Sequence, residues 1–387
     1  MTLTLSSCYW DDKTLFLKYP EPWIDSNYWD KFNFYAWDYW PEVIHTEEAR
    51  FLPTVWDKIE MLIWEWAYTS EIIAYYEHVY SESFCKKNIT PYSWKWYYDI
   101  IREKEKKTLI VGHPYWLIED DKYHINPDLI FSLNDKTNMS KLTNKIPKHT
   151  ILSLNDISDI TNFPFVLKAH SWASWDGVRI IYNNNDLKLA LDYFKNETEL
   201  MVEEFIEIKD NYNVQLIILQ NWNIEMLWSS IQNVTTEWEY NGNYIYKSMI
   251  LPKNIEKLAL EICENAYKLW YNWICWLDII TNKSWDELLI DPNFRLNWST
   301  STLMLKEKVF WETCSNILKV SWFNSNHTDL KTMIKETLKL KDKIIYILSA
   351  YKNKTNWIIH WHCITHWTDE ESLQRNLVNL ETKWFKI

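Results

Sequence analysis

Charged and polar side chains with the chemistry of a nucleotide site stand at the ends of several apolar runs. Lys136 and Lys168 each lie next to a loop, where a lysine supplies a point charge for a triphosphate. Asp278, Asp291 and Asn293 are oxygen donors on two consecutive strand-like runs. The last two are two residues apart in an extended segment, so their side chains point the same way. Hard oxygen donors together with phosphate oxygens form a Mg²⁺ site, so the sequence predicts a metal-bound triphosphate.

The segment around Lys168 predicts a strand, a loop and a return strand. The first strand ends at Lys168, small residues follow, and the second strand begins at Val178. Backbone N–H groups of such a loop can close over phosphates. Trp172 and Trp175 stand where this loop would be expected to carry glycine.

Glycine and tryptophan are out of proportion along the whole chain, which has 3 Gly and 27 Trp in 387 residues. About 7% glycine is usual, so exchanging the two counts would restore an ordinary composition. Trp222 and Trp285 lie in turn-like segments between apolar runs, and Trp270 and Trp384 end helix-like stretches, all positions that favour glycine. The richness in Asn, Ile, Lys and Tyr indicates an AT-rich gene. We therefore hypothesise that most of these tryptophans are glycines encoded by UGA, against the alternative of a truly tryptophan-rich protein.

Charge and cysteine usage limit the classes of partner. The net charge is −12 and the few basic residues are dispersed, which disfavours nucleic acid. No apolar run approaches the roughly 18 residues of a membrane span, and the N-terminus lacks the positive region of a signal peptide. The six cysteines show no paired spacing, as is typical of reduced thiols. We expect a cytoplasmic protein without membrane or nucleic-acid partners, and the oligomeric state stays open.

The elements that must position the polar side chains alternate between strand and helix patterns, which indicates an α/β protein. Strands are predicted within 108–115 and at 128–135, 200–206, 214–219, 224–231, 274–281, 287–291 and 357–364. Helices are predicted at 136–143, 186–196, 255–269, 302–319, 330–350 and 370–382, with a turn leading into a helix at 51–63.

This order of elements resembles the ATP-grasp superfamily of carboxylate–amine ligases over about residues 128–305. Single motifs of this kind are weak, whereas seven in the family's order form a specific pattern. They are Asp135-Lys136, Phe165–Lys168, the lid loop 171–177, the hinge strand 202–206, Leu277-Asp278, Leu289–Asn293 and Asn297–Thr300.

The resemblance implies roles for individual residues. Lys136, Lys168, Ser171, Ser174 and Gly177 would bind the phosphates of ATP. Glu203 and the backbone near Phe205 would contact adenine, and either Asp210 or Asn211 would contact the ribose. Asp278, Asp291 and Asn293 would hold Mg²⁺ or Mn²⁺, and Arg295 together with Lys168 would act in catalysis.

The sequence departs from the family's pattern at two of these positions. Asp291 stands where the family usually has glutamate, so this metal ligand is one methylene shorter. The arginine often found two residues before the first metal aspartate is absent, since Trp276 stands there, and Arg179 or Arg295 is expected to replace its charge.

The resemblance also implies a fold and a reaction. The fold would be ATP-grasp, with a Rossmann-like pre-ATP-grasp domain at 1–127, an ATP-grasp domain at 128–320 whose lid subdomain covers about 146–205, and a region 321–387 that completes the ligase. The layout resembles peptide ligases such as the pheganomycin-type enzyme. A substrate carboxylate would be phosphorylated by ATP, and an amine would displace phosphate from the acyl phosphate.

Other functions stay open on the sequence alone. A degenerate ATP-grasp protein would bind nucleotide without catalysis, and other ATP-grasp enzymes form a thioester or a carboxyphosphate. His360, His362 and Cys363 suggest zinc, but no fourth ligand has a standard spacing, so core or substrate-pocket histidines, including His366, are the preferred interpretation. The acid and the amine are not identified by the sequence.

Overall fold

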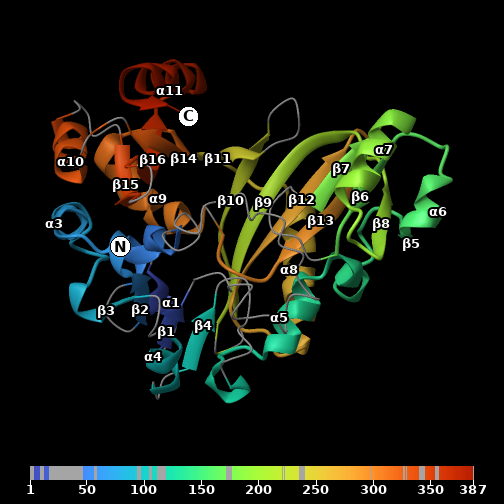
Figure 1. Cartoon of the computed structure of the whole chain (residues 1–387), viewed down its shortest axis with the longest axis horizontal. Coiled ribbons are helices and arrows are strands. Elements are labelled where there is room, and N and C mark those ends of the chain that lie inside the picture. The colour runs from blue at the N-terminus through green and yellow to red at the C-terminus, as the bar shows by residue number, and fades with distance from the viewer. Residues whose placement is uncertain are drawn as a thin grey trace.

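The structure is a computed structural model, and the whole chain is drawn in Figure 1. It describes residues 4–8, 13–16, 47–55, 59–93, 97–103, 107–110, 119–170, 177–219, 221, 223–234, 240–297, 299–325, 327, 329–339, 345–353 and 357–386. Three sheets carry the architecture.

The N-terminal sheet is parallel, with the order β3-β2-β1-β4. Its strands are β1 (Lys13–Phe16), β2 (Ile59–Trp64), β3 (Ile89–Tyr92) and β4 (Lys107–Ile110), with helices α1 (Leu5–Cys8), α3 (Ser70–Val79) and α4 (Tyr97–Glu103). The 3-10 helix η3 (Glu47–Thr54) precedes β2, so the helix predicted to follow the turn at 51–63 is wrong. The apolar run of β2 is almost wholly buried, as parallel strands covered on both faces are, and this burial favours a strand.

The second sheet is antiparallel and has the order β5-β8-β6-β7. Its strands are β5 (His149–Ser153), β6 (Phe165–Lys168), β7 (Val178–Ile181) and β8 (Glu199–Glu204). Helices α6 (Leu154–Ser158) and α7 (Asn184–Tyr193) share a buried core with this sheet. The strand predicted to end at Lys168 and the return strand at Val178 are both present.

The third sheet is the largest and has the order β13-β12-β9-β10-β11-β14-β16-β15, with β17 added beside β14. Its strands are β9 (Ile208–Ile218), β10 (Ile224–Val234), β11 (Tyr240–Tyr246), β12 (Ile274–Asn282), β13 (Glu287–Asn293), β14 (Ile317–Ser325), β15 (Ile345–Lys352), β16 (Ile359–Trp367) and β17 (Phe385–Lys386). The helices around it are α8 (Lys253–Lys268), α9 (Thr300–Thr313), α10 (Leu330–Lys339) and α11 (Glu370–Trp384).

The two smaller sheets lie on either side of the long strands of the large sheet (Figure 1). The small antiparallel sheet with α6 and α7 lies on the side away from α10, α11 and the N-terminal sheet. The tail joins the N-terminal region through hydrogen bonds between α3 and β15, in which the hydroxyls of Tyr76 and Tyr80 donate to the carbonyls of Leu348 and Ile347. The strand β14 crosses residue 320, where one domain boundary was predicted, and the three-domain division stays a prediction.

The strand predicted at 128–135 is wrong, because this segment is helix α5 (Pro127–Asn134). The Asn126 side chain accepts hydrogen bonds from the backbone of Asp128 and Leu129, and Pro127 occupies the first turn. These two start signals outweigh a short apolar run. The next element, predicted as a helix over 136–143, is a 3-10 helix, η7 (Lys136–Lys141).

Two predicted helices extend too far. The helix expected at 302–319 ends at Thr313, since Cys314 adopts a left-handed conformation with φ 53°, and β14 follows. The helix expected at 330–350 ends at Lys339, and β15 occupies its second half. Residues 345–351 are all buried, and their branched and aromatic side chains favour a strand. None of the helices in the described ranges is long and apolar enough to cross a membrane.

Candidate active site

Lys136 and Asp291 form an ion pair between η7 and β13. Lys136 Nζ lies 2.7 Å from Asp291 Oδ1, and the lysine side chain is almost fully buried. The Asp135 side chain caps η7 by accepting from the Thr137 backbone, which fixes the start of this helix. The Lys136 backbone N–H donates to the His170 carbonyl at 3.1 Å, so the first lysine is tied to the residue that precedes the predicted lid loop.

Lys168 joins the small sheet to the large one. Its ammonium lies 2.7 Å from Glu203 Oε1 and donates to the Ile290 carbonyl of β13 at 3.2 Å. Lys168 and Glu203 are both buried. Glu203 Oε2 is buried without a hydrogen-bond partner among the described residues, so it can accept a hydrogen bond from a ligand.

Asp278 and Asp291 face one another across the β12–β13 pair. Asp278 Oδ1 accepts from Asn213 Nδ2 at 2.8 Å and from Gln232 Nε2 at 2.7 Å. Burial, together with the charge of Asp291, raises the pKa of Asp278 to about 8. For Asp291 burial acts in the same direction, but the Lys136 charge outweighs it and lowers the pKa of this carboxyl below its usual value.

This carboxylate pair fits a divalent cation. Among the described residues, Lys136 forms an ion pair with Asp291, while Asp278 accepts hydrogen bonds from two neutral amides. A buried carboxyl with a raised pKa is a group that an added positive charge would stabilise in its ionised form. Asn293, two residues after Asp291, is buried, and its amide also lowers the pKa of Asp291, which puts a third oxygen donor beside the pair.

Arg295 is held in place by Asn134 at the end of α5. Asn134 Oδ1 accepts from Arg295 Nη1 and from the Phe294 backbone, both at 3.0 Å, and its own amide donates to the Ile130 carbonyl. The Arg295 guanidinium also lies 5.6 Å from the ring centre of Trp276. The contact between Asn134 and Arg295 could not be expected from the sequence, because the segment 128–135 was predicted to be a strand.

A buried amide and hydroxyl network extends from the carboxylates to the start of α9. Gln215 Nε2 donates to Asn213 Oδ1, Asn297 Oδ1 and Ser299 Oγ, and Thr300 Oγ1 donates to Gln215 Oε1. These side chains are all buried. The sequence did not point to Asn213 and Gln215 as site residues, although polar residues two apart in an apolar strand are a signal for one common face.

The structure describes only some of the other residues predicted to contact ATP. Ser171 and Ser174, with most of the lid loop, lie outside the described residues. Gly177 is buried, and its carbonyl accepts from the Ala169 N–H at 2.9 Å. Phe205 packs against the Tyr182 ring, with 5.8 Å between the ring centres.

Of the two candidate ribose contacts, the geometry favours Asn211. Its amide donates to Gln232 at 2.9 Å, and Gln232 in turn holds Asp278. Asp210 is the next residue of the strand, so it points to the other face, where it accepts from Thr281.

Comparison with known proteins places this geometry in a family. Residues 147–293 match a family model described as L-aspartate–L-methionine ligase, ATP grasp. Over these residues the chain is an ATP-grasp protein. The predicted fold and enzyme class, an ATP-dependent carboxylate–amine ligase, are confirmed at this level, whereas the roles of single residues stay predictions.

Solved structures share the ATP-grasp fold over nearly the whole length of the chain. N5-carboxyaminoimidazole synthetase from Staphylococcus aureus with ADP is 9% identical, with a TM-score of 0.58, and the match covers 96% of this chain and 97% of that chain. L-amino acid ligase from Bacillus licheniformis is 11% identical, with a TM-score of 0.57 and coverage of 97% and 98%. Carboxyaminoimidazole ribonucleotide synthase from Aspergillus clavatus with ATP is also 11% identical, with a TM-score of 0.57 and coverage of 96% and 97%.

The histidines of the tail form no metal centre among the described residues of the ATP-grasp protein. His362 Nδ1 lies 2.9 Å from Ser349 Oγ, and burial lowers the pKa of His362 to about 3, so the ring is neutral at pH 7. His360 stacks on Tyr351 with 5.2 Å between ring centres.

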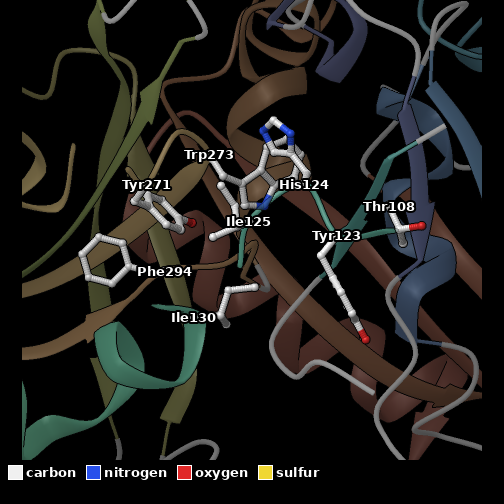
Figure 2. Close-up of a pocket in the computed structure, with 8 residues that line it drawn as sticks. All are labelled: Thr108, Tyr123, His124, Ile125, Ile130, Tyr271, Trp273 and Phe294. Carbon is white, nitrogen blue, oxygen red and sulfur yellow. The ribbon is translucent and has the colours of Figure 1, made fainter. Parts of the chain in front are cut away.

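A small pocket lies next to the site, between the segment 123–130 and the start of β12 (Figure 2). Figure 2 shows the rings of Tyr271 and Phe294 turned toward each other on one side of it, and their centres are 4.8 Å apart. Trp273 is buried and lines this pocket, which none of the predicted phosphate or metal residues line.

Proposed function

We propose that this ATP-grasp protein activates the carboxylate of one amino acid as an acyl phosphate, which the amine of a second amino acid attacks. The proposal is carried by the gathering of Lys136, Lys168, Asp278 and Asp291 around the β12–β13 hairpin. Two buried cations beside two facing carboxylates match a triphosphate with its metal better than they match a structural salt-bridge network, because Asp278 forms no ion pair with the described residues.

ATP would be bound between the small and the large sheet. Lys136 and Lys168 supply the charge for phosphate oxygens, and their partners Asp291 and Glu203 hold both ammonium groups in fixed positions. The free oxygen of Glu203 would accept from the adenine amino group. Asp278, Asp291 and Asn293 would hold Mg²⁺, or Mn²⁺ in its place, which supplies a Lewis acid that neutralises charge on the transferred phosphoryl group.

The reaction has two displacements. An oxygen of the substrate carboxylate attacks the γ-phosphorus of ATP, and the bond to the bridging oxygen breaks to release ADP. The amine nitrogen then attacks the acyl carbon, the bond to the phosphate oxygen breaks, and the nitrogen loses a proton as phosphate leaves. Arg295, oriented by Asn134, would stabilise the negative charge of the acyl phosphate as a charge-assisted donor.

Amino acids are the proposed substrates for both positions. The matching family model is described as a ligase of L-aspartate and L-methionine, and one of the structures with the same fold is an L-amino acid ligase. The chain aligns with 98% of that structure, which supports a ligase of this kind.

The proposal is tested by ADP release from ATP and Mg²⁺ in the presence of pairs of L-amino acids, followed by the mass of the product. We expect release only when both an acid and an amine are present, a dipeptide mass, and loss of activity with EDTA. ATP binding without ADP release from any pair would instead support the non-catalytic alternative. A thioester or carboxyphosphate product would show that the protein is an ATP-grasp enzyme of another reaction type.

A further inference from the structure

Lys306 is a buried cation on α9 with little to neutralise it. Its side chain is 9% exposed, and its ion pair with Glu307 is long, at 3.6 Å, with a glutamate that is mostly in solvent. Burial lowers the pKa of the Lys306 ammonium because it removes the charge from water. Burying an ammonium group costs free energy unless an opposite charge lies beside it, so Lys306 is suited to bind an anionic ligand.

Lys306 faces the same side of the large sheet as the metal carboxylates. Asp278 is bonded to Asn213, and Asn213 is bonded to Gln215 two residues along β9. Trp228 of β10 pairs with Gln215 across the strands, and Lys306 Nζ lies 4.5 Å from the ring centre of Trp228. This series of contacts links the lysine to the reaction centre through the face that the substrate must occupy.

The start of α9 adds a second signal for an anion. Ser301 and Thr302 are fully buried, and their hydroxyls have no hydrogen-bond partner among the described residues. Thr302 precedes Lys306 by four residues, so the two side chains lie on one face of this 14-residue helix. The first turn of a helix also favours negative charge.

We propose that Lys306 and Thr302 bind a second carboxylate of the acid substrate, which makes Lys306 the residue that selects a dicarboxylic amino acid. This inference rests on the proposed function. The reacting carboxylate belongs at Arg295 and the metal ligands, so an additional negative group needs a cation of its own.

The test compares L-aspartate with L-asparagine as the acid, with L-methionine as the amine, in an ADP-release assay. We expect the unmodified protein to prefer L-aspartate by roughly 100-fold in kcat/KM, the size of effect for a buried charge pair. Lys306→Met should abolish this preference, mainly through the KM for L-aspartate, and leave turnover of L-asparagine nearly unchanged. Lys306→Arg should keep most of the preference, and Lys306→Gln replaces the Met variant if that variant does not fold.

Lys319→Met is the matched control. Lys319 is also a buried lysine near an aromatic ring, 5.7 Å from the centre of Tyr244, but it points to the face that carries α11. Its replacement should leave the preference intact. Equal use of both acids by the unmodified protein, or an unchanged preference in Lys306→Met, would overturn the inference while the ligase proposal stands. No turnover of any amino-acid pair would refute both.

We also propose, from separate observations, that glycine occupies most of the printed tryptophan positions. Trp270, Trp285 and Trp357 have φ of 74°, 68° and 62°, a left-handed conformation that glycine adopts readily. Each lies in a turn that requires it. After α8, the Trp270 N–H bonds to the Tyr267 carbonyl and the Tyr271 N–H to that of Ala266, which is a Schellman ending.

The hairpin turns show the same requirement. The Trp285 N–H donates to the Asn282 carbonyl in the turn between β12 and β13. The Trp357 N–H donates to the Asn353 carbonyl between β15 and β16. In the interior, the indole N–H groups of Trp276 and Trp367 are buried without a hydrogen-bond partner among the described residues. Glycine at 276 would free space beside Arg295, where a substrate has to fit.

The mass of the protein purified from its native cells tests this second proposal, together with peptide masses across 270, 285 and 357. We expect glycine masses at these three positions. Peptides that match tryptophan there would overturn the proposal.

Discussion

Asp291 serves two purposes at the level of single residues, as the partner of Lys136 and as the carboxylate opposite Asp278. The position of its side chain is set by β13, whose pairing with β12 brings the two aspartates level. Either role alone would make it sensitive to substitution, and the proposed metal role makes it essential for turnover.

Asp291→Ala should lower ATP turnover by about 10²–10³-fold, the usual effect of losing one strong charge contact with a transition state. The variant should stay folded but melt at a lower temperature, because Lys136 is left buried without its counter-ion. ADP release and a thermal melt measure the two effects. Asp286→Ala, in the exposed turn of the same hairpin, is the control and should change neither. Turnover like that of the unmodified protein would reject the metal assignment.

Trp270 tests the backbone requirement directly. In recombinant protein with the printed sequence, Trp270→Gly should raise the free energy of unfolding by about 1 kcal/mol, because a left-handed residue with a side chain is strained. Trp311→Gly is the matched control, since Trp311 is similarly exposed but lies inside α9, where glycine should destabilise by about 0.5 kcal/mol. Chemical denaturation would give both values, and effects of the same sign would contradict the argument.

Helix α5 acts at the scale of the element by positioning Arg295 through Asn134. Asn134→Ala should lower kcat by about 10-fold with little change in the KM for ATP, because Arg295 loses its orientation while the phosphate lysines keep theirs. The Phe294 N–H also loses its acceptor, which should cost about 1–3 kcal/mol of stability.

Asn134→Asp restores an acceptor at the same point and should recover most of kcat. Steady-state kinetics decide between the alternatives. A change in the KM for ATP of the same size as the change in kcat would indicate a general disturbance of the site instead of a lost orientation.

The elements with strong local signals could be predicted from the sequence, and those with conflicting signals could not. The Lys168 strand, the β12–β13 hairpin and helix α8 follow from apolar periodicity and turn residues. The strand prediction for 128–135 was wrong because a short apolar run fits either a strand or a buried helix. The capping by Asn126 favours the helix. The helix prediction for the second half of 330–350 was wrong because burial of the branched and aromatic side chains of β15 overrides helical spacing.

The site could be predicted only in part for a related reason. The lysines and carboxylates stand at ends of elements, where charge in an apolar context is visible in the sequence. The network of Asn213, Gln215 and Gln232 with Asp278 depends on which strands become neighbours, and β12 is separated from the β9–β10 hairpin by β11 and α8. Nothing in the local sequence around Lys306 indicates burial, which depends on the packing that puts this lysine over Trp228.

The whole molecule is held together by one continuous sheet that contains both the proposed metal strands and the tail. A fragment ending at residue 320 would cut β14 in its middle and remove β16 and β15, and β15 accepts hydrogen bonds from Tyr76 of α3 and from Tyr80, the residue that follows α3. We expect this fragment to lack cooperative folding. Far-UV circular dichroism with thermal melting measures this, and a cooperative melt that ATP shifts upward would contradict it.

The hydrogen bond from the Lys136 backbone to the His170 carbonyl has a consequence for timing. A displacement of His170 would be transmitted to the start of η7, and therefore to the side chain of Lys136, the proposed phosphate contact. Release of ADP would then be timed by the movement of His170 and not by Lys136 alone.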